Sequence, residues 1–306
     1  MTIPLIYGLP AYELLTSQVA RGLGADIGHL SCKNFPDGER YVRILDDVRG
    51  RNAVIIGGTI DDQTTLTLYD LAYALVKYGV QRLIMVVPYF GYGTMERAVL
   101  PGEVVTAKTR ARLLSSIPIA RQGNSIILVD LHSEGVAHYF ENHLTSFHVS
   151  AQSVVLDLIR EFGGKDCVVA STDAGRAKWV EHLANQLGTE AAFVLKRRLS
   201  GSETETISTS AQVHGRHVVI YDDMIRSGSS LIGAAKTYRE AGAKTVSAVA
   251  THGVLVGQSL QRILESGQID RIGVTDTHPA ALALQSPRFE VRSIAPVLIE
   301  ALGRHL

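Results

Sequence analysis

Apolar positions along the chain fall into short, nearly continuous runs that alternate with longer stretches of helical periodicity. The runs are rich in β-branched residues and are typical of strands at 53–58, 82–90, 125–131, 167–171, 217–222, 245–253 and 271–276. Strands that are apolar on both faces are typical of a parallel sheet covered by helices. The pattern therefore predicts buried strands in an α/β protein.

Helical patterns lie between these strands. Residues 61–79 begin with two acids, place leucines at near-helical spacing and end at Gly79. Residues 229–243 follow the same pattern, with Gly242 as a candidate C-cap. Strands that alternate with helices predict βαβ units and a doubly wound, mostly parallel sheet.

The alternation restarts after about residue 146, and a chain of 306 residues fits two domains of about 150 residues each. We expect an N-terminal domain at 1–146 and a C-terminal domain at 147–290. The last segment, 291–306, can return to the N-terminal domain. Each domain is expected to hold its own sheet.

The composition of the chain bears on which partners the protein can bind and on its cellular compartment. Lys+Arg and Asp+Glu both number 30, so the formal net charge is zero, which argues against a nucleic-acid-binding or polybasic membrane surface. Cys32 and Cys167 show neither zinc nor CxxC spacing, which favours a reducing compartment. The N-terminus lacks the features of a secretory signal, and no apolar run is long enough to span a bilayer. We expect a cytoplasmic protein.

Candidate chemistry begins at Asp222 and Asp223, which end an apolar run and precede the loop 227–230, Ser-Gly-Ser-Ser, at the start of a predicted helix. Such a loop alone is more often an ordinary turn and N-cap. Two carboxylates at the end of a buried strand, however, need a partner. A sugar phosphate satisfies both features, because its hydroxyls, or a bridging Mg²⁺, take the acids and its phosphate takes the backbone N–H groups of the helix start.

This pattern resembles the phosphoribosyl-diphosphate binding motif, which type I phosphoribosyltransferases share with ribose-phosphate diphosphokinases. Further landmarks of the diphosphokinase family follow in the right order at 34–44, 88–98, 129–135, 171–175 and 195–198. The resemblance covers essentially the whole chain. It implies two domains with the type I phosphoribosyltransferase fold, and transfer of the diphosphoryl group of Mg·ATP to the 1-hydroxyl of ribose 5-phosphate, a step of nucleotide biosynthesis.

The resemblance also implies residue roles. Lys196 and Arg198 would be catalytic, and His132 and Asp173 would lie near the Mg²⁺. The ATP site would comprise Phe35, stacked on the adenine, with Asp37, Gly38, Glu39, Arg97 and His132. The ribose 5-phosphate site would comprise Asp222, Asp223, Arg226, Ser227, Gly228, Ser229 and Ser230. Without the resemblance, residues 36–38 indicate a plain turn and 195–207 a solvated hairpin or mobile loop.

Two departures from the commoner synthetases bear on subclass. Residues 94–97, Thr-Met-Glu-Arg, stand where those synthetases carry an Arg-Gln pair, and 226–231, Arg-Ser-Gly-Ser-Ser-Leu, resembles the plant-type class II loop. Class II membership implies looser choice among nucleoside triphosphates and no need for phosphate activation. The family forms homodimers that often build into homohexamers. Two alternatives stay open: a non-catalytic homologue that regulates an active synthetase, and a phosphoribosyltransferase.

Overall fold

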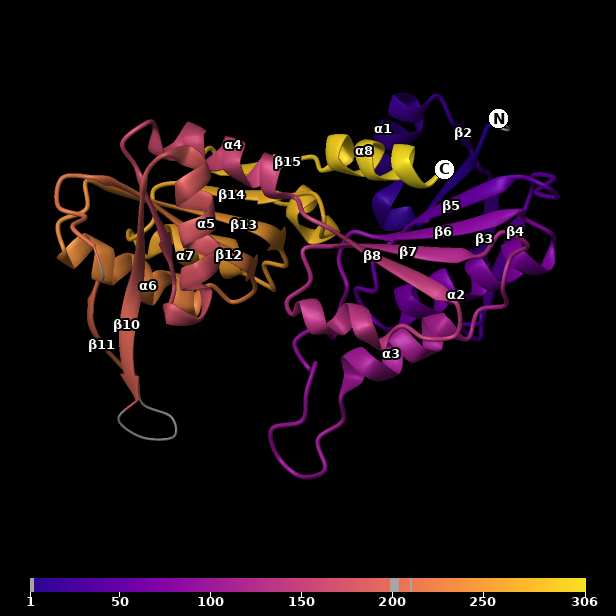
Figure 1. Cartoon of the computed structure of the whole chain (residues 1–306), viewed down its shortest axis with the longest axis horizontal. Coiled ribbons are helices and arrows are strands. Elements are labelled where there is room, and N and C mark those ends of the chain that lie inside the picture. Colours follow the sequence, from indigo (N-terminus) through magenta and orange to yellow (C-terminus); the bar gives the residue numbers. More distant parts are fainter. Residues whose placement is uncertain (1–2, 199–203, 210) are drawn as a thin grey trace. The chain divides into compact units, whose positions relative to one another are not determined.

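The chain forms two compact units in a computed structural model that describes residues 3–198, 204–209 and 211–306, with no description of the side chains of 195–210. Unit 1 comprises Met1–Ser150 together with Ile294–Leu306, and unit 2 comprises Ala151–Ser293. Each unit contains a sheet with helices on both faces (Figure 1). The prediction of an α/β protein with doubly wound, mostly parallel sheets is confirmed.

Unit 1 is built on a six-stranded sheet whose neighbouring strands all run parallel. In spatial order the strands are β2 (Asp26–Ile27), β1 (Leu5–Gly8), β5 (Asn52–Ile56), β6 (Arg82–Val87), β7 (Asn124–Val129) and β8 (Leu144–Val149). A separate antiparallel hairpin pairs β3 (Leu30–Asn34) with β4 (Arg40–Ile44). The central strands are buried on both faces, which explains why their sequences are apolar nearly throughout.

The helices of unit 1 are α1 (Glu13–Leu23), α2 (Asp62–Lys77), α3 (Thr106–Ser115) and α8 (Ala295–His305), and the 3₁₀ turns are η1 (Pro10–Tyr12) and η2 (Glu134–Tyr139). The C-terminal helix α8 packs on α1, with the side chain of Ile299 against the Cα of Gly22. The guanidinium of Arg82 donates to the carbonyl of His305 at 2.7 Å. These contacts tie the last helix to the sheet of unit 1.

Unit 2 is built on a seven-stranded sheet that is parallel except between β10 and β11. In spatial order the strands are β11 (Thr204–Thr209), β10 (Glu190–Arg198), β9 (Val168–Ser171), β12 (His217–Ile225), β13 (Thr245–Gly253), β14 (Ile272–Thr275) and β15 (Phe289–Arg292). Its helices are α4 (Gln152–Gly163), α5 (Ala177–Leu187), α6 (Ser229–Glu240) and α7 (Ser259–Glu265), with 3₁₀ turns η3 (Ala174–Arg176) and η4 (Pro279–Ala283).

Strand β12 separates two hydrophobic cores in unit 2. Val218 and Ile220 pack in the core that contains residues of α6 and α7, whereas Val219 and Tyr221 pack in the core that contains residues of α4 and α5. Side chains alternate along a strand, so successive residues of β12 point to opposite faces of the sheet. By the same alternation, the side chains of Asp222 and Asp223, which follow in β12, are directed to opposite faces of the sheet.

All seven strands predicted from apolar runs are present, with small differences at their ends. One difference bears on the site: β12 was expected to end at Asp222 but continues to Ile225. Its neighbour β13 runs alongside it to the end, with Ile225 paired to Gly253, and this ladder extends the strand. None of the helices in the described part of the chain combines the length and the apolar character needed to cross a bilayer.

Candidate active site

The candidate site lies at the point where the strand order of unit 2 reverses. From β9 the chain passes through α5 to β10 on one side, and from β12 it passes through α6 to β13 on the other. Doubly wound sheets bind ligands in the crevice that such a reversal opens beyond the carboxyl ends of the strands. Asp173 follows β9 and Asp222 lies near the end of β12, so the fold brings two of the predicted residues to this edge.

A pocket of about 230 Å³ is lined by Asp222, by Met224–Arg226 and by the loop and first turn of α6 at Ser227–Leu231. It brings together six of the seven residues predicted for ribose 5-phosphate. Asp223, the seventh, is not among the described residues that line it. The alternation along β12 explains this difference, because Asp222 follows the α6 face of the sheet and Asp223 follows the α5 face.

The loop before α6 takes its shape from Gly228. This residue has φ of 77°, in the left-handed region, and a Cβ added to it would clash with the side chain of Ile263 on α7. A glycine is therefore required on both grounds. The guanidinium of Arg262, the neighbour of Ile263, donates a hydrogen bond to the carbonyl of Ser227 and so links the loop to α7.

The start of α6 is suited to an anion. The N-cap residue of α6 is Gly228, and in the described structure it provides no side-chain hydrogen bond to the start of the helix. The N–H of Ser229 makes only a long contact of 3.4 Å with the hydroxyl of Ser227. The first N–H groups of a helix have no partner within the helix, and together with the helix dipole they favour negative charge. The loop therefore provides donors for a phosphate group.

The two acids of β12 differ in their partners. Asp223 is buried, and its Oδ2 lies 2.7 Å from a guanidinium nitrogen of Arg176. Asp222 is half-buried and accepts a long hydrogen bond of 3.4 Å from the hydroxyl of Thr172. Burial raises the pKa of the Asp222 carboxyl above its usual range, the charge of Asp223 raises it further, and Arg176 opposes both.

A divalent cation fits this excess of negative charge. Mg²⁺ prefers carboxylate oxygens, keeps several waters and uses one or two protein ligands, so the Asp222 carboxylate, which lines the pocket, supplies a suitable donor, whereas Asp223 is paired with Arg176. Asp173 uses Oδ1 to accept from the N–H of Gly175 at 2.9 Å, as the N-cap of η3. His132 belongs to unit 1, where it is exposed after β7. Among the described residues no group of three or more His, Cys, Asp and Glu side chains is arranged around a metal position.

The predicted adenine residues lie in the turn of the β3–β4 hairpin. Gly38 has φ of 92°, and its N–H donates to the carbonyl of Phe35 at 2.9 Å. Asp37 accepts from the N–H of Glu39 at 3.0 Å, which closes the turn. Phe35 is 41% exposed, and Lys33 Nζ lies 5.1 Å from the centre of its ring. The tip therefore presents an aromatic ring and two acids on a well-defined turn, an arrangement that is compatible with a plain turn and with a nucleotide loop.

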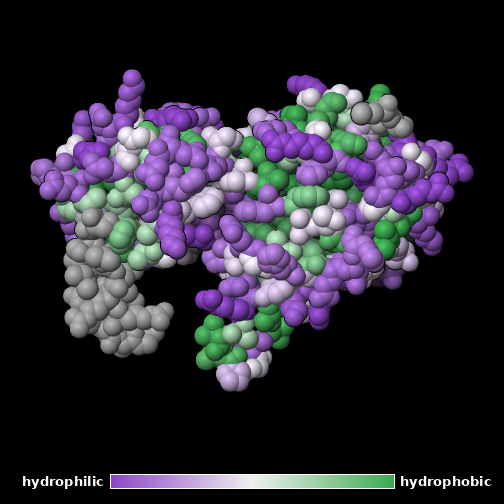
Figure 2. All heavy atoms as spheres, viewed as in Figure 1, coloured by the Kyte–Doolittle hydropathy of each residue, from purple (hydrophilic) through white to green (hydrophobic). Residues whose placement is uncertain are grey.

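Arg97 lies in the segment that connects β6 to α3, which carries exposed apolar side chains at Met95, Val99, Leu100 and Val104. Figure 2 shows this segment as a green projection below unit 1. Arg97 is 77% exposed and lies 3.5 Å from Glu96. The residues at 94–97, Thr-Met-Glu-Arg, thus begin a connection whose later positions are exposed and apolar.

The predicted catalytic residues lie on the β10–β11 hairpin. The backbone of Lys196 pairs with Thr206 and that of Arg198 with Thr204, after a register shift between Leu195 and Lys196. The side chains of both residues are outside the described part of the chain. Their catalytic role therefore stays a prediction.

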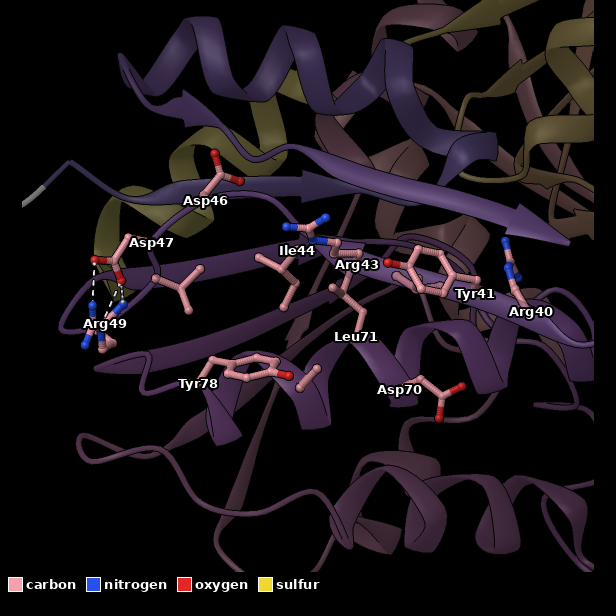
Figure 3. A pocket seen from close by; sticks show the side chains of 13 residues that line it. Arg40, Tyr41, Arg43, Ile44, Asp46, Asp47, Arg49, Asp70, Leu71 and Tyr78 are labelled. Atoms are coloured by element: carbon pink, nitrogen blue, oxygen red, sulfur yellow. Dashed lines mark hydrogen bonds and ion pairs between the residues drawn. The ribbon is translucent and has the colours of Figure 1, made fainter.

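A wider pocket of about 740 Å³ lies between β4 and α2 in unit 1 (Figure 3). Tyr41, Leu71 and Tyr78 contribute aromatic and apolar surface, and Arg49 is paired with Asp47 at 3.2 Å. None of the residues predicted for substrate, metal or catalysis lines this pocket.

Two residues near the acids were not anticipated from sequence. Thr172 reaches Asp222, and Arg176 reaches Asp223, from the segment that follows β9. Both lie beside or within the landmark at 171–175, but their partners are far away in the chain. Only the pairing of β9 with β12, which aligns Ala170 with Ile220, brings them together.

The fold and the crevice place the chain in the class of doubly wound α/β proteins that bind ligands at a switch point. The family model for the N-terminal domain of ribose phosphate pyrophosphokinase matches residues 5–117, and that for the phosphoribosyl synthetase-associated domain matches residues 184–306. The chain belongs to the ribose-phosphate pyrophosphokinase family, as the sequence resemblance predicted.

Individual relatives match along nearly their whole length. A ribose-phosphate pyrophosphokinase from Helicobacter hepaticus is 32% identical over 98% of this chain and 94% of its own, and one from Chromobacterium violaceum is 34% identical over 95% and 88%. The crystal structure of phosphoribosylpyrophosphate synthetase from Mycobacterium smegmatis has a TM-score of 0.87 and 29% identity, with all of both chains covered.

Proposed function

We propose that this protein is a ribose-phosphate diphosphokinase. It transfers the diphosphoryl group of Mg·ATP to the 1-hydroxyl of ribose 5-phosphate and produces 5-phosphoribosyl 1-diphosphate and AMP. Besides family membership, the main support for this proposal is the pocket at the end of β12. The Asp222 carboxylate and the start of α6, which has no side-chain cap, line the same small cavity.

In the proposed complex the phosphate of ribose 5-phosphate binds the backbone N–H groups of Ser227–Ser230, and Arg226 contributes positive charge. Asp222 and Asp223 take the ribose hydroxyls, directly or through Mg²⁺. The raised pKa of Asp222 supports this role, since hydroxyl donors or a cation would relieve the excess negative charge. We assign this site to a C-terminal ribose-phosphate-binding domain.

The nucleotide is assigned to the N-terminal domain. Phe35 stacks on the adenine while Asp37, Gly38 and Glu39 contact its edge, and the exposure of the Phe35 ring supports this assignment. Arg97 and His132 are proposed to contact the triphosphate. His132 and Asp173 are the residues that would hold Mg²⁺, which would supply positive charge for the phosphate oxygens.

The chemistry forms a bond between the sugar O1 and the β-phosphorus of ATP and breaks the bond between that phosphorus and the oxygen bridging to the α-phosphorus. AMP leaves, and the proton of the 1-hydroxyl passes to solvent or to a base. Catalysis of this kind depends on positioning and on charge stabilisation. Lys196 and Arg198 are proposed to stabilise the charge that develops on the transferred group.

Three finer assignments belong to the proposal. The substitutions at 94–97 and the loop at 226–231 support a plant-type class II member that accepts several nucleoside triphosphates and needs no phosphate activation. The protein is proposed to be cytoplasmic, with no nucleic-acid or membrane partner, and to assemble as a homodimer or homohexamer.

A ³¹P NMR assay with MgCl₂, ATP and ribose 5-phosphate tests the function directly. Formation of AMP together with a new diphosphate resonance is the expected result. Lack of turnover would favour the regulatory homologue, and turnover only of 5-phosphoribosyl 1-diphosphate with a nucleobase would favour the phosphoribosyltransferase. The same assay with GTP, CTP and UTP, with and without added phosphate, tests the subclass.

A further inference from the structure

Arg176 has no role in the substrate contacts proposed above, although it pairs with one of the two acids of β12. It ends η3, and its guanidinium lies 2.7 Å from Asp223 Oδ2. The Asp223 side chain is only 7% exposed and that of Arg176 is 26% exposed. A carboxylate buried this deeply is costly unless a cation accompanies it, so the pair stabilises the ionised form of Asp223.

The segment after β9 contacts both acids of β12. Thr172 donates to Asp222 Oδ2, and Arg176 pairs with Asp223. The backbone N–H of Asp223 also donates to Asp222 Oδ1 at 3.0 Å. The ion pair of Arg176 with Asp223 ties the segment after β9 to the end of β12, and Thr172 of that segment contacts Asp222. The direction of the Asp222 carboxylate therefore depends on this ion pair.

We propose that Arg176 is a positioning residue for ribose 5-phosphate: its pair with Asp223 fixes the segment after β9 against β12, so that Thr172 keeps Asp222 directed into the pocket at the start of α6. The inference rests on the proposed function of that pocket. Arg176 acts through Asp223, not by contact with the substrate. A guanidinium suits this task because its planar group makes directional contacts with a carboxylate, which the ammonium of lysine does less well.

The first test is steady-state kinetics of Arg176→Gln, which removes the charge and keeps a polar side chain. We expect the KM for ribose 5-phosphate to rise about tenfold or more, because the buried Asp223 carboxylate loses its partner. The KM for ATP and the kcat at saturating sugar should stay within about threefold of the wild type. An unchanged KM for ribose 5-phosphate would overturn the proposal.

A matched control is Arg216→Gln. Arg216 pairs with Glu190 at 3.0 Å in the same unit, and its side chain is 29% exposed, close to the value for Arg176. Its partner, however, is exposed and lies away from the pocket. We expect all kinetic constants of this variant to match the wild type. An equal rise in the sugar KM would show that loss of any such ion pair has this effect, and would overturn the specific role.

A double-mutant cycle separates indirect from direct action. If Arg176 acts through Asp223, the variant with both Arg176→Gln and Asp223→Asn should have a sugar KM no higher than Asp223→Asn alone. Independent, multiplicative effects would show that Arg176 acts on the substrate by itself and would overturn the proposal. Arg176→Lys should recover part of the affinity lost in Arg176→Gln.

The double-mutant cycle also gives a result if the single variant Arg176→Gln does not fold. If Arg176→Gln alone is unfolded because it leaves a buried charge, the double variant removes that charge and should fold, and its sugar KM then decides the question. Titration calorimetry of wild type with ribose 5-phosphate distinguishes the two proposals. Absence of wild-type binding refutes the proposed function, whereas wild-type binding that Arg176→Gln retains in full refutes only the role of Arg176.

Discussion

Two strands of this protein end in similar sequences, and in the described part of the chain one of them ends at a pocket that matches the predicted ligand. In unit 1, β7 leads into Asp130 and His132; in unit 2, β12 contains Asp222 and Asp223. Strand β7 lies between β6 and β8, away from a reversal of strand order, and the 3₁₀ turn η2 follows it. Strand β12 lies at the reversal and leads through Gly228 into α6.

The difference teaches that an acid after an apolar strand becomes part of a phosphate-ester site only where the topology adds a helix start. Asp130 is buried with φ of 36°, and no glycine and serine loop opens a helix after it. Asp222 shares its pocket with the loop at 227–230. We therefore expect substitutions at the end of β12 to affect the sugar phosphate, and substitutions after β7 to affect the nucleotide.

The largest effect is expected from Lys196→Ala. Loss of a cation that stabilises the transferred group should lower kcat by about 10²–10³-fold, while ribose 5-phosphate still binds to the end of β12. Stopped assays at saturating substrates measure kcat, and calorimetry measures the sugar. Near-normal turnover would refute the catalytic assignment of this lysine.

The next effect is expected from Gly228→Ala. The left-handed backbone and the clash with Ile263 should displace the loop and raise the KM for ribose 5-phosphate on the order of 100-fold, through lost hydrogen bonds to a charged group. Gly215→Ala is the control, since Gly215 also has positive φ, at 73°, but open space around it. It should lose about 1 kcal/mol of stability. Equal sugar KM values in the two variants would argue against the loop as the phosphate site.

Asp222→Asn tests the comparison between the two strands most specifically. Replacing the carboxylate should raise the KM for ribose 5-phosphate about tenfold, the cost of a hydrogen bond to a charged group, and leave the KM for ATP unchanged. His132→Ala should show the opposite selectivity, with the KM for ATP raised. If both variants affected the same substrate, the division of roles between the two strand ends would be wrong.

The smallest effect concerns stability. The pKa of Asp222 is raised in the folded state, so the folded protein binds this proton more tightly than the unfolded chain does. The resulting stabilisation is complete below about pH 4, the usual aspartate pKa, and is lost as the pH rises through the higher folded-state pKa. Urea unfolding of wild type and Asp222→Asn between about pH 4 and 8 should show wild type losing stability relative to the variant. A constant difference would contradict the raised pKa.

Sequence patterns predicted the architecture well because long, fully buried strands leave a strong apolar signal. The runs at 82–90 and 245–253 became β6 and β13, and helix α2 was predicted close to its observed bounds, with Gly79 at φ of 93° after it. The two-residue strand β2 is exposed and too short for such a signal.

The candidate site was predictable only where its residues are close together in the chain. The segment from Asp222 to Ser230 contains its own strand, loop and helix start, so its pattern was readable. The ion pair of Arg176 with Asp223 and the contact of Gly228 with Ile263 join distant segments, and no local pattern reports them. Strand alternation could have separated the directions of the two acids, but only once β12 was known to continue beyond them.

Amide chemical shifts of the isotope-labelled protein test the central claim most directly, namely that the phosphate of the sugar binds the backbone at the start of α6. Addition of ribose 5-phosphate should shift the N–H resonances of Gly228, Ser229 and Ser230, whereas ribose without its phosphate should leave them in place. Shifts confined to the residues after β7, or no shift at the start of α6 at saturating ribose 5-phosphate, would contradict the account.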